Sequence, residues 1–188
     1  RLPAPVLARA ARGRLCASRG VLRASVQHPR RRARGPAGRR PALAAGTVVV
    51  VAAGNSNANA ANYSPASCSN VITVASTGHT GSRAYYSNYG ASIEIAAPGG
   101  DAQLGKTILS TLNAGATTPG ADSYTSYQGT SMAAPHVAGV ASLMLSRNPA
   151  LTPAQVTSML QSSVTPFPAG STCVGLTPCG TGILNAAA

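Results

Sequence analysis

The sequence lacks the features that mark several large classes of protein. Its longest apolar run, "ALAAGTVVVVAAG", is too short and too interrupted by glycine to cross a bilayer, so no membrane-spanning segment is expected. No apolar stretch of signal-peptide length follows the basic N-terminal residues, and no internal repeat occurs. Acidic residues are also scarce. Only three occur in 188 residues, and Asp101, which follows two glycines, does not make a cation site by itself.

The basic residues that are present are unevenly distributed. Residues 1–45 hold 12 of the 15 lysines and arginines and no acidic residue, whereas residues 46–188 hold three basic and three acidic residues. Residues 1–45 also contain no aromatic residue, and 32 of them are Arg, Ala, Gly or Pro. Because such a segment cannot bury much apolar surface, we predict a disordered basic segment over 1–45 and a globular part over 46–188.

The composition of residues 1–45 has two interpretations. GC-rich codons yield Arg, Ala, Gly and Pro when they are read in the wrong frame, so our first interpretation is a shifted or mispredicted start joined to a genuine globular sequence. The second is a basic arm around Arg30–Arg34 that binds nucleic acid or another acidic surface. The segment has no aromatic residue for base stacking and no recognition motif, so nucleic acid is not an expected partner.

The four cysteines indicate an oxidising compartment. Cys173 and Cys179 enclose a short stretch with Gly and Pro, "CVGLTPC", and we predict a local disulfide between them. The alternative is a pair of free thiols, since no second ligand pair lies nearby for a metal. Cys68 has no obvious partner in the globular part, and Cys16 lies in the basic segment.

The globular part alternates short apolar runs with helical patterns. The continuous apolar character of the runs is typical of strands that are buried on both faces of a parallel sheet. We predict an α/β fold with a mostly parallel sheet flanked by helices. The expected strands are Thr47–Ala53, Asn70–Ser76, Ser92–Ala97 and a short edge strand Thr107–Leu112, and the expected helices are Ser131–Arg147 and a second one that begins after the capping residue Thr152.

The start of the first helix is chemically unusual. Ser131 would lie in the first turn, where free backbone N–H groups and the positive end of the helix dipole favour a developing negative charge. Gly129 would let a substrate backbone approach closely, and Pro135 lacks the N–H that would bond to the Ser131 carbonyl. A Thr-Ser pair before a helix is often only a cap, so the dipeptide alone does not settle the role of Ser131.

The longer string around Ser131, "GTSMAAPHVAG", closely resembles the serine motif of the subtilases, the subtilisin-like serine proteases. Further segments resemble the same family in the same order: "VVVVAAGN", "YSPASCSNVITVAS", "YSNYGASIEIAAPGG", "ILSTL" and "GTGILNAAA". The likeness runs from about residue 46 to residue 188, which corresponds to the second half of a subtilase catalytic domain. It implies a partial subtilisin-like fold and a secreted, monomeric endopeptidase that acts on proteins or peptides.

The resemblance also implies individual roles. Ser131 would be the nucleophile, and its backbone N–H together with the Asn55 side-chain amide would form the oxyanion hole. The alternative for Asn55 is a plain Gly-Asn turn after a strand. Pro65 would follow a cis peptide bond. The substrate-binding residues would be Ala52, Ala53, Gly54, Gly129 and Thr130.

The sequence does not contain the other half of the expected catalytic machinery. A serine hydroxyl needs a base and an orienting carboxylate, which subtilases carry in an Asp-Ser/Thr-Gly and a His-Gly-Thr-His motif, and neither motif occurs here. His28 and His79 match no catalytic position of the family, and His136 lies five residues along the helix from Ser131. We therefore expect the chain alone to be inactive. No cofactor can be assigned, although an intact family member could bind calcium. The alternative is a non-catalytic pseudoprotease that serves as a binding fragment.

The first interpretation of residues 1–45 predicts a result at the nucleotide level. Translating the underlying DNA in the other two frames should yield the missing Asp and His motifs upstream of residue 46. Failure to find either motif in any frame would contradict a shifted or mispredicted start.

Overall fold

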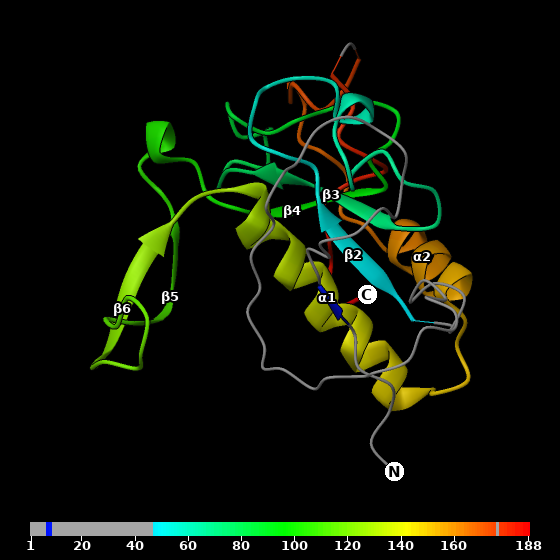
Figure 1. Ribbon diagram of the computed structural model, residues 1–188. Helices are drawn as coiled ribbons and strands as arrows, with labels where there is room; N and C mark the ends of the chain where they lie inside the picture. The colour runs from blue at the N-terminus through cyan, green and yellow to red at the C-terminus, as the bar shows by residue number, and fades with distance from the viewer. Residues whose placement is uncertain (1–6, 9–46, 176) are drawn as a thin grey trace.

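The computed structural model describes residues 7–8, 47–175 and 177–188 (Figure 1). The strands are β1 (Leu7–Ala8), β2 (Val49–Ala52), β3 (Ile72–Thr77), β4 (Ile95–Pro98), β5 (Ile108–Asn113) and β6 (Asp122–Tyr127), the helices are α1 (Thr130–Arg147) and α2 (Pro153–Ser162), and short 3₁₀ turns span Ala60–Asn62 and Ala102–Leu104. Apart from β1, the predicted disordered segment, with Cys16, His28 and Arg30–Arg34, lies outside the described residues.

The main sheet is parallel throughout, as the apolar runs predict. Its strand order is β1-β2-β3-β4, and each neighbouring pair runs in the same direction. Val50 lies opposite Ile72, and Val74 lies opposite Ile95. β2, β3 and β4 begin two or three residues later than expected, and β4 ends on Pro98, one residue beyond the expected end. This sheet places the C-terminal ends of β2, β3 and β4 side by side.

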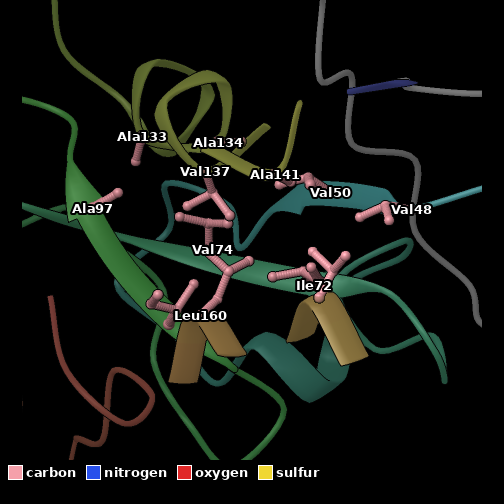
Figure 2. Close-up of a cluster of buried hydrophobic side chains, with 12 residues drawn as sticks. Val48, Val50, Ile72, Val74, Ala97, Ala133, Ala134, Val137, Ala141 and Leu160 are labelled. Atoms are coloured by element: carbon pink, nitrogen blue, oxygen red, sulfur yellow. The ribbon is translucent and has the colours of Figure 1, made fainter. Parts of the chain in front are cut away.

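One face of the sheet packs against both helices. Alternate strand residues point to this face, because successive side chains of a strand point in opposite directions. In Figure 2, Val137 of α1 lies above Val74, and Leu160 of α2 approaches from the opposite side of the cluster. The buried cluster consists of Val48, Val50, Ile72, Val74, Ile95, Ala97, Ala133, Ala134, Val137, Ala141, Val156 and Leu160.

The other face of the sheet is covered by loops. Ala53, Ala75 and Ala96 pack there against Ile93 and against both cysteines of the C-terminal loop. Val49 and Val51 pack next to them, against Cys68 and Val71. Both faces of the strands are therefore buried, which accounts for their continuous apolar sequence.

The two helices begin where the sequence indicates. α1 begins at Thr130, one residue before the expected start, and contacts β2, β3 and β4 along its length. In α2 the Thr152 side chain accepts from the Gln155 backbone N–H, and the Gln155 side chain accepts from the Thr152 N–H, so the predicted capping box is confirmed. No helix among the described residues combines the length and apolar character that a membrane crossing requires.

The C-terminal tail closes the outer edge of β4. The Ala96 N–H donates to the Gly182 carbonyl at 2.9 Å, and the Leu184 N–H donates to the Ala96 carbonyl at 2.8 Å. Ile183 also exchanges both backbone hydrogen bonds with Thr165, at 2.8 Å each. An open apolar edge would invite aggregation, and this short tail removes it at β4.

The structure contains a hairpin that the sequence analysis missed. β5 does not lie at the edge of the main sheet. It pairs in an antiparallel direction with β6, a strand that was not among the expected ones, and together they stand apart from the main sheet (Figure 1). β6, "DSYTSY", has no apolar run, because its strand-forming Tyr and Thr residues are interspersed with Asp and Ser. The Asn113 side chain holds the hairpin tip by accepting from the Gly115 and Gly120 N–H groups.

The covalent and backbone predictions are confirmed. Cys173 and Cys179 form a disulfide, and the Ser64–Pro65 peptide bond is cis. Cys68, for which no partner was expected, is also disulfide-bonded.

Glu94 should make the folded chain less stable as the pH rises. This is the reverse of the effect of a carboxyl whose pKa is lowered by folding. Burial raises the pKa of Glu94, and its hydrogen bond from the Thr73 N–H only partly offsets the effect. The folded chain therefore keeps this proton to a higher pH than the unfolded chain does. Between the two pKa values unfolding releases a proton, so the free energy of unfolding falls as the pH rises. Urea unfolding at several pH values between the two pKa values of Glu94 should show that the free energy of unfolding of the wild type falls with rising pH. The free energy of unfolding of Glu94→Gln should fall less. A wild type that gains stability relative to Glu94→Gln with rising pH would contradict this assignment.

Candidate active site

The site lies where β2 ends and α1 begins. After Ala52 the chain leaves the sheet through a buried Gly54 and reaches Asn55, which is exposed. The Gly54 N–H donates to the Thr130 hydroxyl at 3.1 Å, which ties this loop to the first residue of α1. Ligands of open α/β sheets bind at the carboxyl ends of strands, and this junction is such a place.

Two hydrogen bonds fix the orientation of the Asn55 side chain. Its Oδ1 accepts from the Thr130 backbone N–H at 2.9 Å and from the Thr130 hydroxyl at 2.8 Å. The two donors assign this atom as the oxygen of the amide, because a nitrogen could not accept from them. The Nδ2 group must then point away from Thr130.

The Asn55 amide nitrogen and the Ser131 backbone nitrogen both lie close to Gly129. A Cβ atom placed on Gly129 would lie 3.3 Å from Asn55 Nδ2 and 3.7 Å from the Ser131 nitrogen. Gly129 itself has φ +153°, a conformation that side-chain-bearing residues rarely adopt. Ser131 is half-buried in the first turn of α1. Two N–H donors that flank one position next to a serine can stabilise a negatively charged oxygen.

Most of the residues that were predicted to bind substrate are buried. Thr130 was expected to contact substrate, but its side chain is fully buried and orients Asn55 from behind. Ala53 is also fully buried and packs in the core, and Gly54 and Gly129 are buried, whereas Ala52 is partly exposed. The substrate-binding role of these residues remains a prediction.

The sequence analysis did not single out two buried polar residues next to this junction, Tyr86 and Asn88. Tyr86 donates its hydroxyl to the carbonyls of Gly99 and Gly100, at 3.0 and 2.6 Å, and Gly99 in turn accepts from the Gly129 N–H at 2.9 Å. Burial raises the pKa of Tyr86 to about 12, so its hydroxyl keeps its proton as a donor. Only the string "YSNYGASIEIAAPGG" pointed to this region, and it did so without indicating either role.

The two described histidines do not hydrogen-bond to Ser131. His136 is exposed and bonds through Nδ1 to the Met132 carbonyl at 2.8 Å, and His79 lies in an exposed loop. Neither histidine hydrogen-bonds to Ser131 in the part of the chain that the structure describes. Asp101 uses its carboxylate to accept backbone N–H groups of Tyr85 and Gln103.

The structure assigns no set of calcium ligands among its described residues. Within residues 47–175 and 177–188, no group of three or more His, Cys, Asp or Glu side chains gathers in a way that could hold a metal ion. The carboxylates of Asp101 and Glu94 are each engaged by backbone N–H groups instead.

Comparison with known proteins gives a consistent result. A family model described as "Subtilase family" matches residues 16–176. An extracellular protease of Xanthomonas campestris pv. campestris is 51% identical over 146 residues, which are 77% of this chain and 23% of that protein. Subtilisin BL of Lederbergia lenta is 38% identical over 147 residues, which are 78% of this chain and 47% of that protein. A solved structure of proteases from Pseudoalteromonas arctica PAMC 21717 matches with a TM-score of 0.69 and 53% identity, covering 78% of this chain and 42% of that one.

These matches cover only part of each relative. The chain spans less than half the length of each protein named above. The family match also begins at residue 16, inside the basic segment that the sequence analysis set apart.

Two glycines provide a matched test of the packing at this junction. A Cβ on Gly99 would lie 2.1 Å from the Ser76 hydroxyl oxygen and 2.6 Å from the Gly129 carbonyl oxygen, so Gly99→Ala should lower the free energy of unfolding by about 1–3 kcal/mol. Gly139 lies inside α1 with no atom within 4 Å of its virtual Cβ, so Gly139→Ala should raise it by about 0.5–1 kcal/mol. Urea unfolding measures both variants. Equal effects would contradict the close packing of Gly99.

Proposed function

Since this chain belongs to the subtilase family, we propose that residues 46–188 form the C-terminal part of the catalytic domain of a secreted serine endopeptidase. The whole protein would cleave peptide bonds in proteins through an acyl-enzyme on Ser131. The observation that supports this proposal is that the Asn55 amide nitrogen and the Ser131 backbone nitrogen both lie beside Gly129, with Asn55 Oδ1 bonded to Thr130.

The proposed chemistry uses both of these N–H groups. The Ser131 hydroxyl oxygen attacks the carbonyl carbon of the peptide bond and loses its proton to a base, while the π electrons move onto the carbonyl oxygen. The Asn55 amide and the Ser131 N–H donate to this oxyanion, and the N-terminal end of α1 adds its positive dipole. The tetrahedral species then expels the amine, which takes up a proton. Water finally attacks the acyl-enzyme in the same way and releases the acid.

The base and its orienting carboxylate would come from residues other than those described. Neither His79 nor His136 bonds to Ser131, so the chain alone should not turn over protein substrates. Subtilisins without their triad keep only about 10³–10⁴-fold catalysis over water, from the oxyanion hole and binding. The Cys173–Cys179 disulfide and the extracellular relative are the observations that support secretion.

An activated ester with an external base tests this proposal on the 188-residue chain. In p-nitrophenyl acetate with imidazole, Ser131 should become acetylated, because imidazole takes the proton that no described histidine can take. Without imidazole the acetylation should stay at background. Peptide mapping by mass spectrometry locates the acetyl group, and Ser131→Ala is the control.

Asn55→Asp makes the test specific for the oxyanion hole. The aspartate retains an oxygen for the two hydrogen bonds from Thr130 but loses the amide donor. Losing such a donor in a subtilisin costs about 10²–10³ in turnover, so a fall of about 10² in the imidazole-dependent rate is expected. Acetylation elsewhere in the chain, or an unchanged rate in Asn55→Asp, would overturn the proposed function.

A further inference from the structure

The proposed oxyanion hole requires two donors that lie far apart in the sequence. Asn55 follows β2, and Ser131 belongs to α1, so each is carried by its own backbone segment. Thr130 links the two segments directly. A third segment, Ala84–Asn88, makes buried hydrogen bonds to two backbone carbonyls. One belongs to Ala53, just before Asn55, and the other belongs to Gly100, next to the residue that bonds to Gly129.

Asn88 holds the backbone around Asn55. Its Oδ1 accepts from the N–H groups of Ser56 and Ala58, at 2.9 and 3.1 Å, and its Nδ2 donates to the Ala53 carbonyl at 2.9 Å. The Asn88 backbone N–H donates to the Gly54 carbonyl at 2.9 Å. These four bonds bracket Asn55 on both sides without touching it. The Asn88 side chain is fully buried, so water cannot replace the partners that a mutation removes.

Tyr86 holds the backbone that precedes Ser131. Its hydroxyl donates to the Gly99 and Gly100 carbonyls and also contacts the Ser76 hydroxyl at 2.7 Å. Because Gly99 accepts from the Gly129 N–H, the tyrosine acts on the residue two positions before the nucleophile. Its ring is buried, with 7% of the side chain exposed.

Both residues are anchored to the same strand. The Ser87 hydroxyl accepts from the Ser76 N–H at 2.9 Å, and the Ala84 N–H donates to the Ser76 carbonyl at 2.9 Å. Ser76 belongs to β3, which lies between β2 and β4 in the sheet. The segment that carries Tyr86 and Asn88 is therefore hydrogen-bonded to β3 at Ser76.

We propose that Asn88 is a positioning residue for the Asn55 donor, and that Tyr86 is a positioning residue for the Ser131 donor. This inference rests on the proposed function. Neither side chain contacts the reacting atoms. Together they set the separation of the two N–H groups, and a displacement of about 1 Å in such a site costs about 10² in rate.

A double-mutant cycle separates positioning from general support of the fold. Asn88→Ala should lower the imidazole-dependent acetylation of Ser131 by about 10–10². If Asn88 acts through the Asn55 amide, Asn88→Ala should change the rate less than about twofold in the Asn55→Asp background, where that donor is already absent. If Asn88→Ala lowered the acetylation rate by the same factor in the wild type and in Asn55→Asp, or lowered it in neither, the proposed role of Asn88 would be overturned.

Two further variants complete this design. Asn113→Ala removes an asparagine with the same pattern of contacts at the hairpin tip, and it should leave the rate within about twofold of the wild type. Tyr86→Phe keeps the ring and removes one hydroxyl, and it should lower the rate by a similar factor in the wild type and in Asn55→Asp, because it acts on the other donor. A Tyr86→Phe rate equal to that of the wild type would overturn the role of Tyr86.

If Asn88→Ala does not fold, Asn88→Asp replaces it in the same cycle. The aspartate keeps an acceptor for Ser56 and Ala58, but it replaces the donor to the Ala53 carbonyl with a second, buried oxygen that cannot donate.

An NMR measurement that involves no reaction can test the positioning of Asn55 separately from the proposed function. A wild-type chain that is never acetylated overturns the proposed function, and the positioning of Asn55 is then judged by ¹⁵N NMR alone. The Asn55 side-chain amide resonance should move in the Asn88 variant and stay in place in Asn113→Ala. An unmoved resonance would overturn the inference.

Discussion

The pair of hydrogen bonds from Thr130 to Asn55 is the interaction on which the site depends. It joins the end of a buried strand to the start of a helix across a sequence separation of 75 residues. It also decides which end of the Asn55 amide faces outward. If the amide were reversed, an oxygen would face the Ser131 N–H group, and the junction could not stabilise an oxyanion. The sheet and the two helices fix the positions between which this interaction forms.

The surrounding polar network explains why the interaction is well defined. Thr130, Asn88 and Ser76 are all fully buried and all hydrogen-bonded. In a buried setting an unpaired polar group is costly, so each member holds the next in a single arrangement. Small residues make this possible, since Gly99 and Gly129 let the backbone of three segments approach within hydrogen-bonding distance. A site of this kind needs accurate backbone placement more than it needs many side chains.

Elements that a short stretch of sequence specifies could be predicted. Features that depend on contacts between distant residues could not. The strands β2, β3 and β4 are recognisable from continuous apolar runs, and α2 from its capping box. β6 was missed because its mixture of Asp, Ser, Thr and Tyr residues does not distinguish a strand from a polar loop. Asn88 was missed for a different reason: its partners lie 30 to 35 residues away, and no local pattern marks an asparagine that clamps a distant loop. Ser131 and Asn55 were predicted from the resemblance to subtilases and not from a local pattern, and the burial of Thr130 could not be predicted because burial depends on the assembled fold.

The most direct measurement is an experimental structure of the chain with a peptidyl boronic acid bound at Ser131. The account predicts that one boron-bound oxygen lies within hydrogen-bonding distance of both Asn55 Nδ2 and the Ser131 nitrogen, with Asn55 Oδ1 still bonded to Thr130. A boronate whose oxygens contact neither nitrogen, or an Asn55 amide turned away from Ser131, would contradict it.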